Sequence, residues 1–279
     1  MPLDGKRICG PEGTKSPLLF IPKKQTNLLD DNRKRTDGRH AEDLRPLFLR
    51  LGINSQARGS AYIEMNRTKV VATVYGPREI QRRREFDMKG QLLCEFKFAP
   101  FSCKVRRQYQ PDNEEKALSS VLRETLEPVV CLHKFPKSRV DIFVLVLEND
   151  GSALAAAITC AGAALVDAGI DMYDVVIGCG LRQDEATTLV DPVYEEEYRP
   201  EDNHQSGEHG NMVLGFMPLL QQVAALQCDG ELQPKTVSAA LGMLMESCYG
   251  IYSIVQECLT ESLKNKLKKR EKDVTKVIS

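Results

Sequence analysis

The sequence predicts an α/β (α+β) fold of two similar ββαβα units, with mixed sheets and packed helices. Two apolar strands stand at the centre of the chain, at residues 140–147 and 175–179. Between them lies a helix of small residues that starts after the turn at 150–152. Its larger apolar residues recur at helical spacing and alanines fill most other positions, which indicates burial on several sides. Strands and helices follow in a similar order in the two halves of the chain, which suggests the duplication.

The composition limits the classes of protein that this chain can belong to. The 279 residues are 42% hydrophobic, enough for one large domain or two small ones with a sizeable core. The formal net charge is −1, so contact with nucleic acid must come from local basic clusters. The nine cysteines form no CxxC pair, which argues against zinc ribbons and favours reduced, buried thiols in an intracellular protein. We expect neither a signal peptide nor a membrane span, because no apolar run approaches the roughly 18 residues that a span needs.

The first half of the chain begins with a polar segment and continues with short strands. Residues 1–44 carry mixed charge and predict an extended N-terminal arm that orders against another surface. Strand candidates separated by glycine and proline follow at 47–49, 61–63, 70–75 and 92–98, and we interpret them as an antiparallel meander. A helix is expected over 113–131, capped by Asp112 or Asn113 and bent or ended early by Pro128.

The second half is expected to contain two strands and a long helix. The strands are predicted at 187–190 and 212–217, with a polar, acidic loop at 191–210 between them. Apolar residues at steps of four and three predict a helix over 236–267, and its basic end suits a helix C-terminus. We therefore divide the chain into an N-terminal arm (1–44), a domain at 45–272 and a C-terminal tail (273–279). The domain has halves at about 45–168 and 169–272.

The turn at 150–154 is the first candidate site. Free N–H groups and the helix dipole favour an anion at a helix N-terminus. Ser152 offers a hydroxyl, but Ala153 and Leu154 follow it and no cation stands in the first turn. The alternative is a plain helix start capped by Asp150 or Ser152.

The acidic loop and the histidines are weaker candidates. Paired carboxylates could bind Mg²⁺ or act as general acids, whereas solvated charge on a loop is the other interpretation. The carboxylates in question are those of Asp191, Glu195, Glu196, Glu197, Glu201 and Asp202. The histidines lack the spacing of a zinc site, so no metal site is predicted; they are His40, His133, His204 and His209.

A basic set is the candidate for contact with nucleic acid. Phe101 and Tyr109 lie near it in sequence and could stack on bases, so the set could follow a phosphate backbone. A charged loop without a partner is the other interpretation. The set comprises Arg82, Arg83, Arg84, Lys97, Lys104, Arg106 and Arg107.

Several separated stretches are similar to one known family. RPLFLRLGINSQARGSAYIEMNRTKVVATVYGPRE (45–79) and FPKSRVDIFVLVLENDGSALAAAITCAGAAL (135–165) resemble the RNase PH family, and LVDPVYEEE and NMVLGFMP follow in the expected order. The likeness covers roughly residues 40–260 and is greatest to the ring subunits of the eukaryotic RNA exosome. It implies two ββαβα halves related by pseudo-twofold symmetry, like the second domain of ribosomal protein S5.

The resemblance also implies what the candidate sites have lost. Active members of the family cleave RNA by phosphorolysis, in which inorganic phosphate attacks the 3′-terminal phosphodiester. They hold phosphate with a Gly-Thr/Ser-Arg turn, whose positions here carry Ser152, Ala153 and Leu154. The general acid falls at Glu197 and a second aspartate at His209. The resemblance thus implies degenerate phosphate and acid sites, no catalytic residues and no cofactor.

The implied function is that of a catalytically silent subunit of a six-membered exosome ring. Such a ring channels RNA 3′ ends for 3′→5′ processing and degradation, as in rRNA processing and mRNA turnover. The implied partners are other RNase PH-type subunits, cap subunits with S1 or KH domains, RNase II-type and RNase D-type nucleases and RNA, with no membrane. The implied locations are the nucleus, the nucleolus and the cytoplasm. The alternative is an active phosphate-dependent 3′-exoribonuclease with a variant site.

Overall fold

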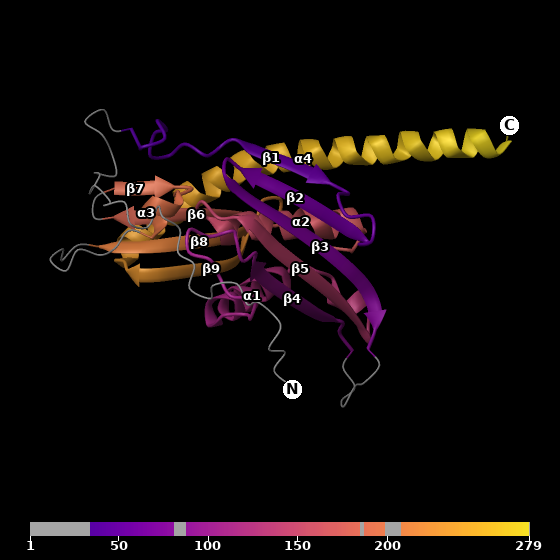
Figure 1. Ribbon diagram of the computed structural model, residues 1–279, viewed down its shortest axis with the longest axis horizontal. Helices are drawn as coiled ribbons and strands as arrows, with labels where there is room; N and C mark the ends of the chain where they lie inside the picture. The colour runs from indigo at the N-terminus through magenta and orange to yellow at the C-terminus, as the bar shows by residue number, and fades with distance from the viewer. Residues whose placement is uncertain (1–33, 81–87, 185–186, 199–207, 279) are drawn as a thin grey trace, which may run out of the picture.

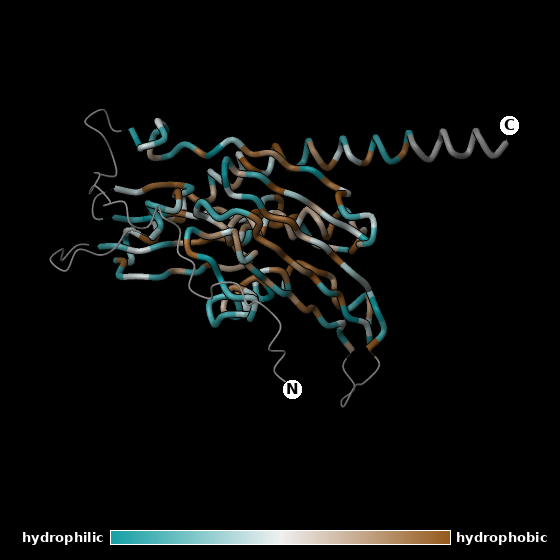
Figure 2. Tube along the Cα trace, in the orientation of Figure 1, coloured by the Kyte–Doolittle hydropathy of each residue, from teal (hydrophilic) through white to brown (hydrophobic). Residues whose placement is uncertain are grey.

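A computed structural model describes residues 34–80, 88–184, 187–198 and 208–278, with side chains as far as residue 268. Two sheets lie on either side of a central helix, and a second long helix runs along one edge of the molecule (Figure 1). The most hydrophobic segments of the chain gather between these elements (Figure 2). None of the described helices is both long and apolar enough to cross a membrane.

The first sheet has five strands in the order β1-β2-β3-β5-β4. Its strands are β1 (Leu47–Leu51), β2 (Gly59–Met65), β3 (Thr68–Glu79), β4 (Gln91–Phe98) and β5 (Ser138–Glu148). The predicted meander is confirmed for β1, β2 and β3, which pair antiparallel. It is wrong for β4, which lies at the far edge and pairs parallel with β5. The reason is that α1 (Asn113–Leu126) connects these two strands, and parallel neighbours need such a crossover.

The second sheet is antiparallel, with four strands in the order β7-β6-β8-β9. These are β6 (Ile177–Asp184), β7 (Thr187–Val190), β8 (His209–Met217) and β9 (Gln222–Glu231). The first three were expected, and β7 has the predicted bounds. Strand β9 was not predicted, because both of its faces are largely exposed and its sequence lacks a buried face.

The central helix α2 (Ala153–Ala168) packs against both sheets, and its small residues are the reason. Fourteen of its sixteen residues are buried. A Cβ at Gly178 of β6 would collide with the backbone of Ala155, and one at Gly59 of β2 would collide with the backbone of Ala168. The alanine-rich helix and these glycines together allow the backbones to approach closely.

The two remaining long helices begin or end where the sequence dictates. In α1, Asp112 occupies the N-cap position and its N–H donates to Glu115, as expected for a capped start. The helix ends at Leu126, two residues before Pro128. Helix α4 (Pro234–Ile278) continues beyond the predicted end at 267 and through residues 273–278 of the predicted tail. No glycine or proline follows Gly250, so nothing in the sequence stops the helix earlier. Its C-terminal part projects away from the sheets (Figure 1).

Candidate functional site

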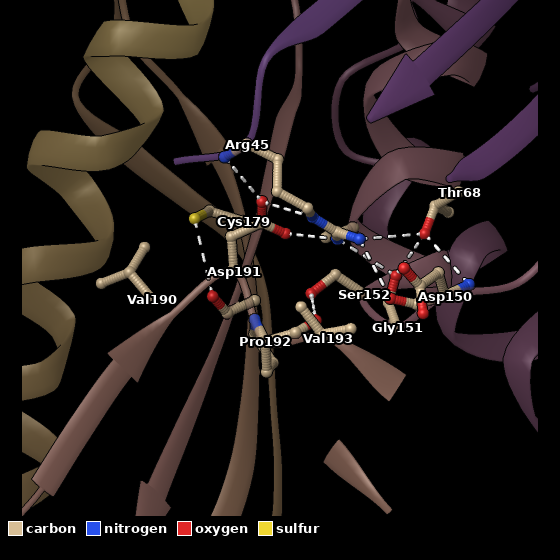
Figure 3. Close-up of polar contacts among 12 residues, drawn as sticks. Arg45, Thr68, Asp150, Gly151, Ser152, Cys179, Val190, Asp191, Pro192 and Val193 are labelled. Carbon is tan, nitrogen blue, oxygen red and sulfur yellow. Dashed lines mark hydrogen bonds and ion pairs between the residues drawn. The ribbon is translucent and has the colours of Figure 1, made fainter. Parts of the chain in front are cut away.

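The candidate site forms where the turn before α2 meets the segment that follows β7. Gly151 has a φ of +90°, and a Cβ there would collide with the carbonyl oxygen of Pro192. Ser152, at the N-cap position, has a φ of +51° in the left-handed region. Figure 3 shows the two segments side by side, with Pro192 and Val193 close to Ser152. The contact between backbones therefore depends on glycine at 151.

The N-terminus of α2 is occupied by a carboxyl group of the chain itself. The backbone N–H of Ser152 donates to the carboxylate of Glu197 at 2.9 Å, and the Ser152 hydroxyl donates to the carbonyl of Pro192 at 3.2 Å. Ser152 is thus at the N-cap position, as the plain-helix alternative expects, but its hydroxyl does not cap the helix. Ala153 and Leu154 are buried and bring no polar group. An incoming anion would have to displace Glu197.

Glu197 titrates far from its ordinary range. Burial raises the pKa of its carboxyl to about 7, although the N–H of Ser152 and the charge of Arg45 act in the opposite direction. It belongs to α3 (Tyr194–Glu197), a single helical turn inside the predicted acidic loop. At neutral pH both the neutral and the charged form of this carboxyl are therefore populated.

Asp191, the first residue of the acidic motif, is held by a buried arginine. Arg45 donates to its two carboxylate oxygens at 2.8 and 2.6 Å, and both side chains are almost fully buried. Arg45 also donates to the hydroxyl of Thr68 and to the carbonyls of Asp150 and Gly151, as drawn in Figure 3. Burial alone would raise the pKa of Asp191, but the hydrogen bonds and charge of Arg45 outweigh it and lower the pKa. Asp191 is therefore an ionised structural partner.

A second buried arginine ties the residues before β1 to the same region. Arg35 is 1% exposed and donates to the carbonyls of Val190 at 2.6 Å and Ala41 at 2.9 Å. Its guanidinium lies 3.8 Å from the carboxylate of Glu196, whose pKa burial raises. Arg35 and Ala41 thus attach this part of the predicted arm to β7, although most residues between 36 and 43 are exposed. Residues 1–33 lie outside the described part of the chain.

Part of the predicted basic set lies beside α3. Lys104 donates to Glu195 at 2.9 Å and stands 4.7 Å from the ring centre of Tyr194. Arg107 pairs with Glu114 at 2.9 Å and stacks over the ring of Phe98. Arg106, in contrast, is exposed. Of the predicted RNA-binding residues in this segment, Lys104 and Arg107 are therefore both engaged by acidic partners, whereas Arg106 is exposed.

The two aromatic residues near the predicted basic set are exposed, and some of the remaining basic residues lie outside the described part of the chain. Phe101 and Tyr109 are 71% and 77% exposed, so both rings are open to stacking. Lys97 lies near the end of β4 and is half-buried. The residues of the predicted set at 81–87, namely Arg82, Arg83 and Arg84, lie outside the described residues.

The three histidines within the described residues lie on different elements. His209 starts β8, in register with Asp184 and Glu231. His40 lies in the segment before β1, and His133 stacks on Tyr173. His204, Glu201 and Asp202 lie outside the described residues. Within the described residues, no group of three or more His, Cys, Asp or Glu side chains could hold a metal ion.

Sequence reasoning missed the two buried arginines, although one signal was present. Arg45 is the first residue of the stretch that carries the family resemblance, yet an arginine before a strand is usually solvated. Its main partner, Asp191, lies 146 residues away in the chain, and its other acceptors are also distant in sequence.

Comparison with known proteins identifies the family of this chain. Residues 43–171 match the family model described as "3' exoribonuclease family, domain 1" (RNase PH). The chain is 36% identical over 283 residues to the mouse protein "Exosome complex component MTR3", a match that covers 95% of this chain and 98% of the relative. The chain belongs to the RNase PH family.

Other RNase PH relatives and structures extend this finding. "Exosome complex component Rrp41" of Thermococcus kodakarensis is 36% identical over 235 residues, covering 84% of this chain and 91% of the relative. The crystal structure of rice Rrp46 superimposes with a TM-score of 0.68 at 26% identity, covering 81% of this chain and 100% of that one. An Archaeoglobus fulgidus exosome "with RNA bound to the active site" also gives a TM-score of 0.68, at 20% identity over 80% of this chain and 92% of that one. The last match shows the RNase PH fold alone.

Proposed function

We propose that this chain is a non-catalytic ring subunit of an RNA exosome. The observation that carries the proposal is the hydrogen bond from Ser152 to Glu197 at the N-terminus of α2. In the resembled active members this turn holds the attacking phosphate. Here the chain places its own carboxyl group against it, and Ala153 and Leu154 supply neither a hydroxyl nor a guanidinium.

The nearest guanidinium cannot replace the missing one. The five N–H donors of Arg45 are matched by five hydrogen bonds, to Asp191, Thr68, Asp150 and Gly151. Recruiting Arg45 to a phosphate would break a buried ion pair, which costs about 3–5 kcal/mol when one partner is left alone. Asp191 and the ionised form of Glu197 would also repel the phosphate.

Membership of the family and the edges of the two sheets support the scaffolding role. Strands β1 and β4 lie at the two edges of the five-stranded sheet. At the edge of the other sheet, β9 exposes 43% of Val223 and 40% of Leu226. Such edges are templates for pairing with another chain. We infer neighbours of RNase PH type, with S1- or KH-domain cap subunits above the ring.

In this assembly the chain would help to guide RNA 3′ ends to associated RNase II-type and RNase D-type nucleases. The exposed Arg106, with the exposed rings of Phe101 and Tyr109 near it in sequence, supports contact with the RNA. The corresponding locations are the nucleus, the nucleolus and the cytoplasm, where rRNA processing and mRNA turnover take place.

One observation favours the alternative, an active phosphate-dependent 3′-exoribonuclease. A carboxyl group whose pKa is about 7 is suited to general acid catalysis near neutral pH, and Glu197 has this property. It lacks a nucleophile beside it, however, because the turn at 152–154 offers no phosphate site. We therefore prefer the scaffolding role.

The assembly part of the proposal is tested by the mass of the chain in solution. The full chain should self-associate or precipitate when expressed alone and should form a defined complex when co-expressed with RNase PH-type partners. Leu226→Lys on β9 should weaken that complex, whereas Lys235→Gln, outside the edge strand, should leave it intact. A monodisperse, folded monomer that ignores such partners would contradict the ring-subunit role.

A further inference from the structure

The outward face of the five-stranded sheet carries a group of side chains that the proposed scaffolding role does not use. Along β3 and β5 the buried residues alternate with more exposed ones, because successive side chains point to opposite faces. Helix α2 packs on the buried side, where Val74 and Ile142 lie. On the other side, Phe143 and Leu145 are 37% and 38% exposed.

A shallow, open hollow of about 450 Å³ lies on this outward face, lined by Thr73, Tyr75, Arg78 and Phe143. The rings of Tyr75 and Phe143 meet edge to face, with centres 5.8 Å apart. The guanidinium of Arg78 stands 5.0 Å from the ring centre of Tyr75. The hollow therefore combines two aromatic rings from neighbouring strands with one cation.

The charge at the rim of the hollow is positive and only partly neutralised. Arg78 and Arg139 are cross-strand partners in the β3–β5 pair, so two positively charged residues face each other across the two strands. Arg139 is neutralised by Asp141 at 2.7 Å. For Arg78 the described residues provide a ring and no carboxylate partner. A negatively charged group near Arg78 would relieve this excess.

The chemistry of the hollow selects its ligand. Aromatic side chains on an exposed sheet face stack on unpaired bases, and an arginine beside them can pair with the adjacent phosphate. The hollow has no carboxylate cluster for a metal and no deep enclosure for a small metabolite. We propose that Tyr75, Phe143 and Arg78 form a base-stacking site for single-stranded RNA, which rests on the proposed role in an RNA-handling assembly.

The test compares leucine variants with a matched control on the same sheet. Tyr75→Leu and Phe143→Leu remove the rings but keep apolar side chains, and Phe48→Leu does the same to a 55% exposed ring of β1 outside the hollow. Binding of fluorescein-labelled oligouridine is measured by anisotropy over a salt series, using the complex that contains the full chain. The double variant should bind roughly tenfold more weakly with an unchanged salt slope, because stacking releases no counterions. Tyr75→Phe should bind like the wild type.

Arg78→Gln should act differently, reducing the salt slope by about one because one phosphate contact is lost. Oligouridine carrying 4-thiouridine should crosslink to peptides that contain Tyr75 or Phe143. In the contrary outcome, the wild-type complex binds RNA, the Tyr75→Leu and Phe143→Leu variants bind as well as Phe48→Leu, and no such crosslink forms. That result overturns the base-stacking site but leaves the proposed role as an exosome subunit intact.

Two further outcomes are decisive. A wild-type complex that binds no oligouridine would overturn both the site and the RNA-handling role. If instead Tyr75→Leu and Phe143→Leu prevent assembly with partner chains, the hollow is a protein interface and the RNA site is overturned.

Discussion

The N–H of Ser152 and the carboxyl of Glu197, 45 residues apart in the chain, meet at the start of the central helix at 2.9 Å. This contact joins the two positions at which the family resemblance implies degenerate sites. It explains how an N-terminus of a buried helix remains satisfied without a phosphate: the protein supplies an internal acceptor.

The first prediction concerns the pH dependence of that contact. Because the pKa of Glu197 is raised to about 7 in the folded protein, the folded state binds the proton more tightly than the unfolded state does. The stabilising effect of the proton is present below the unfolded pKa and is lost as the pH rises through 7. Glu197→Gln should therefore be more stable than the wild type at pH 8, by on the order of 1–2 kcal/mol for this partly exposed group. The difference should shrink as the pH falls and vanish below the unfolded pKa of 4.5, as measured by urea unfolding. Equal pH profiles for the two proteins would refute it.

The second prediction concerns the buried ion pair. Arg45→Met leaves the carboxylate of Asp191 buried without its main partner, which should lower the free energy of unfolding by about 3–5 kcal/mol. Lys69→Met, at the more exposed pair with Glu148, should change it much less. Since the pKa of Asp191 is lowered, the contribution of the pair is present at neutral pH and is lost as the pH falls through the folded pKa. Chemical denaturation at several pH values measures both effects, and similar losses for the two variants would contradict the assignment.

The third prediction tests the close packing of the central helix. Gly178→Ala places a methyl group against the backbone of Ala155, and should destabilise the protein by about 2–3 kcal/mol. Gly242→Ala is the matched control, because Gly242 lies in α4 with nothing within 4 Å of the added Cβ. There alanine should stabilise by roughly 0.5–1 kcal/mol. Thermal unfolding of the two variants should move in opposite directions; a shift in the same direction would show that packing at β6 is looser than described.

The fourth prediction separates two neighbouring arginines that the sequence treats alike. Arg106 is exposed, so Arg106→Ala should reduce the salt slope of RNA binding by about one. Arg107 is paired with Glu114 and stacked on Phe98, so Arg107→Ala should mainly reduce stability. Binding titrations and melting curves of the two variants in the assembled complex decide this. A larger loss of salt slope for Arg107→Ala than for Arg106→Ala would reverse the assignment.

Elements with strong local patterns could be predicted from the sequence, and elements defined by distant partners could not. The central helix, its two flanking strands and the cap at Asp112 follow from apolar periodicity and capping chemistry. The parallel pairing of β4 with β5 depends on a crossover, and β9 depends on its neighbour β8, so neither has a local signature.

The candidate site shows the same division. The sequence shows Ala153 and Leu154 where the family resemblance implies phosphate-binding side chains. The hydrogen bond between Ser152 and Glu197 has no signal in the sequence, because it spans 45 residues. The burial of Arg45 likewise depends on Asp191, and a single sequence carries no signal for such a pair.

The most direct test of the central claim is phosphorolysis by the purified chain and by its complex with RNase PH-type partners that lack active sites. Release of nucleoside diphosphates from single-stranded RNA is measured with and without inorganic phosphate. A non-catalytic subunit should give no phosphate-dependent release in either preparation. Robust phosphate-dependent release that is abolished by Glu197→Gln would contradict the account and establish an enzyme with a variant site.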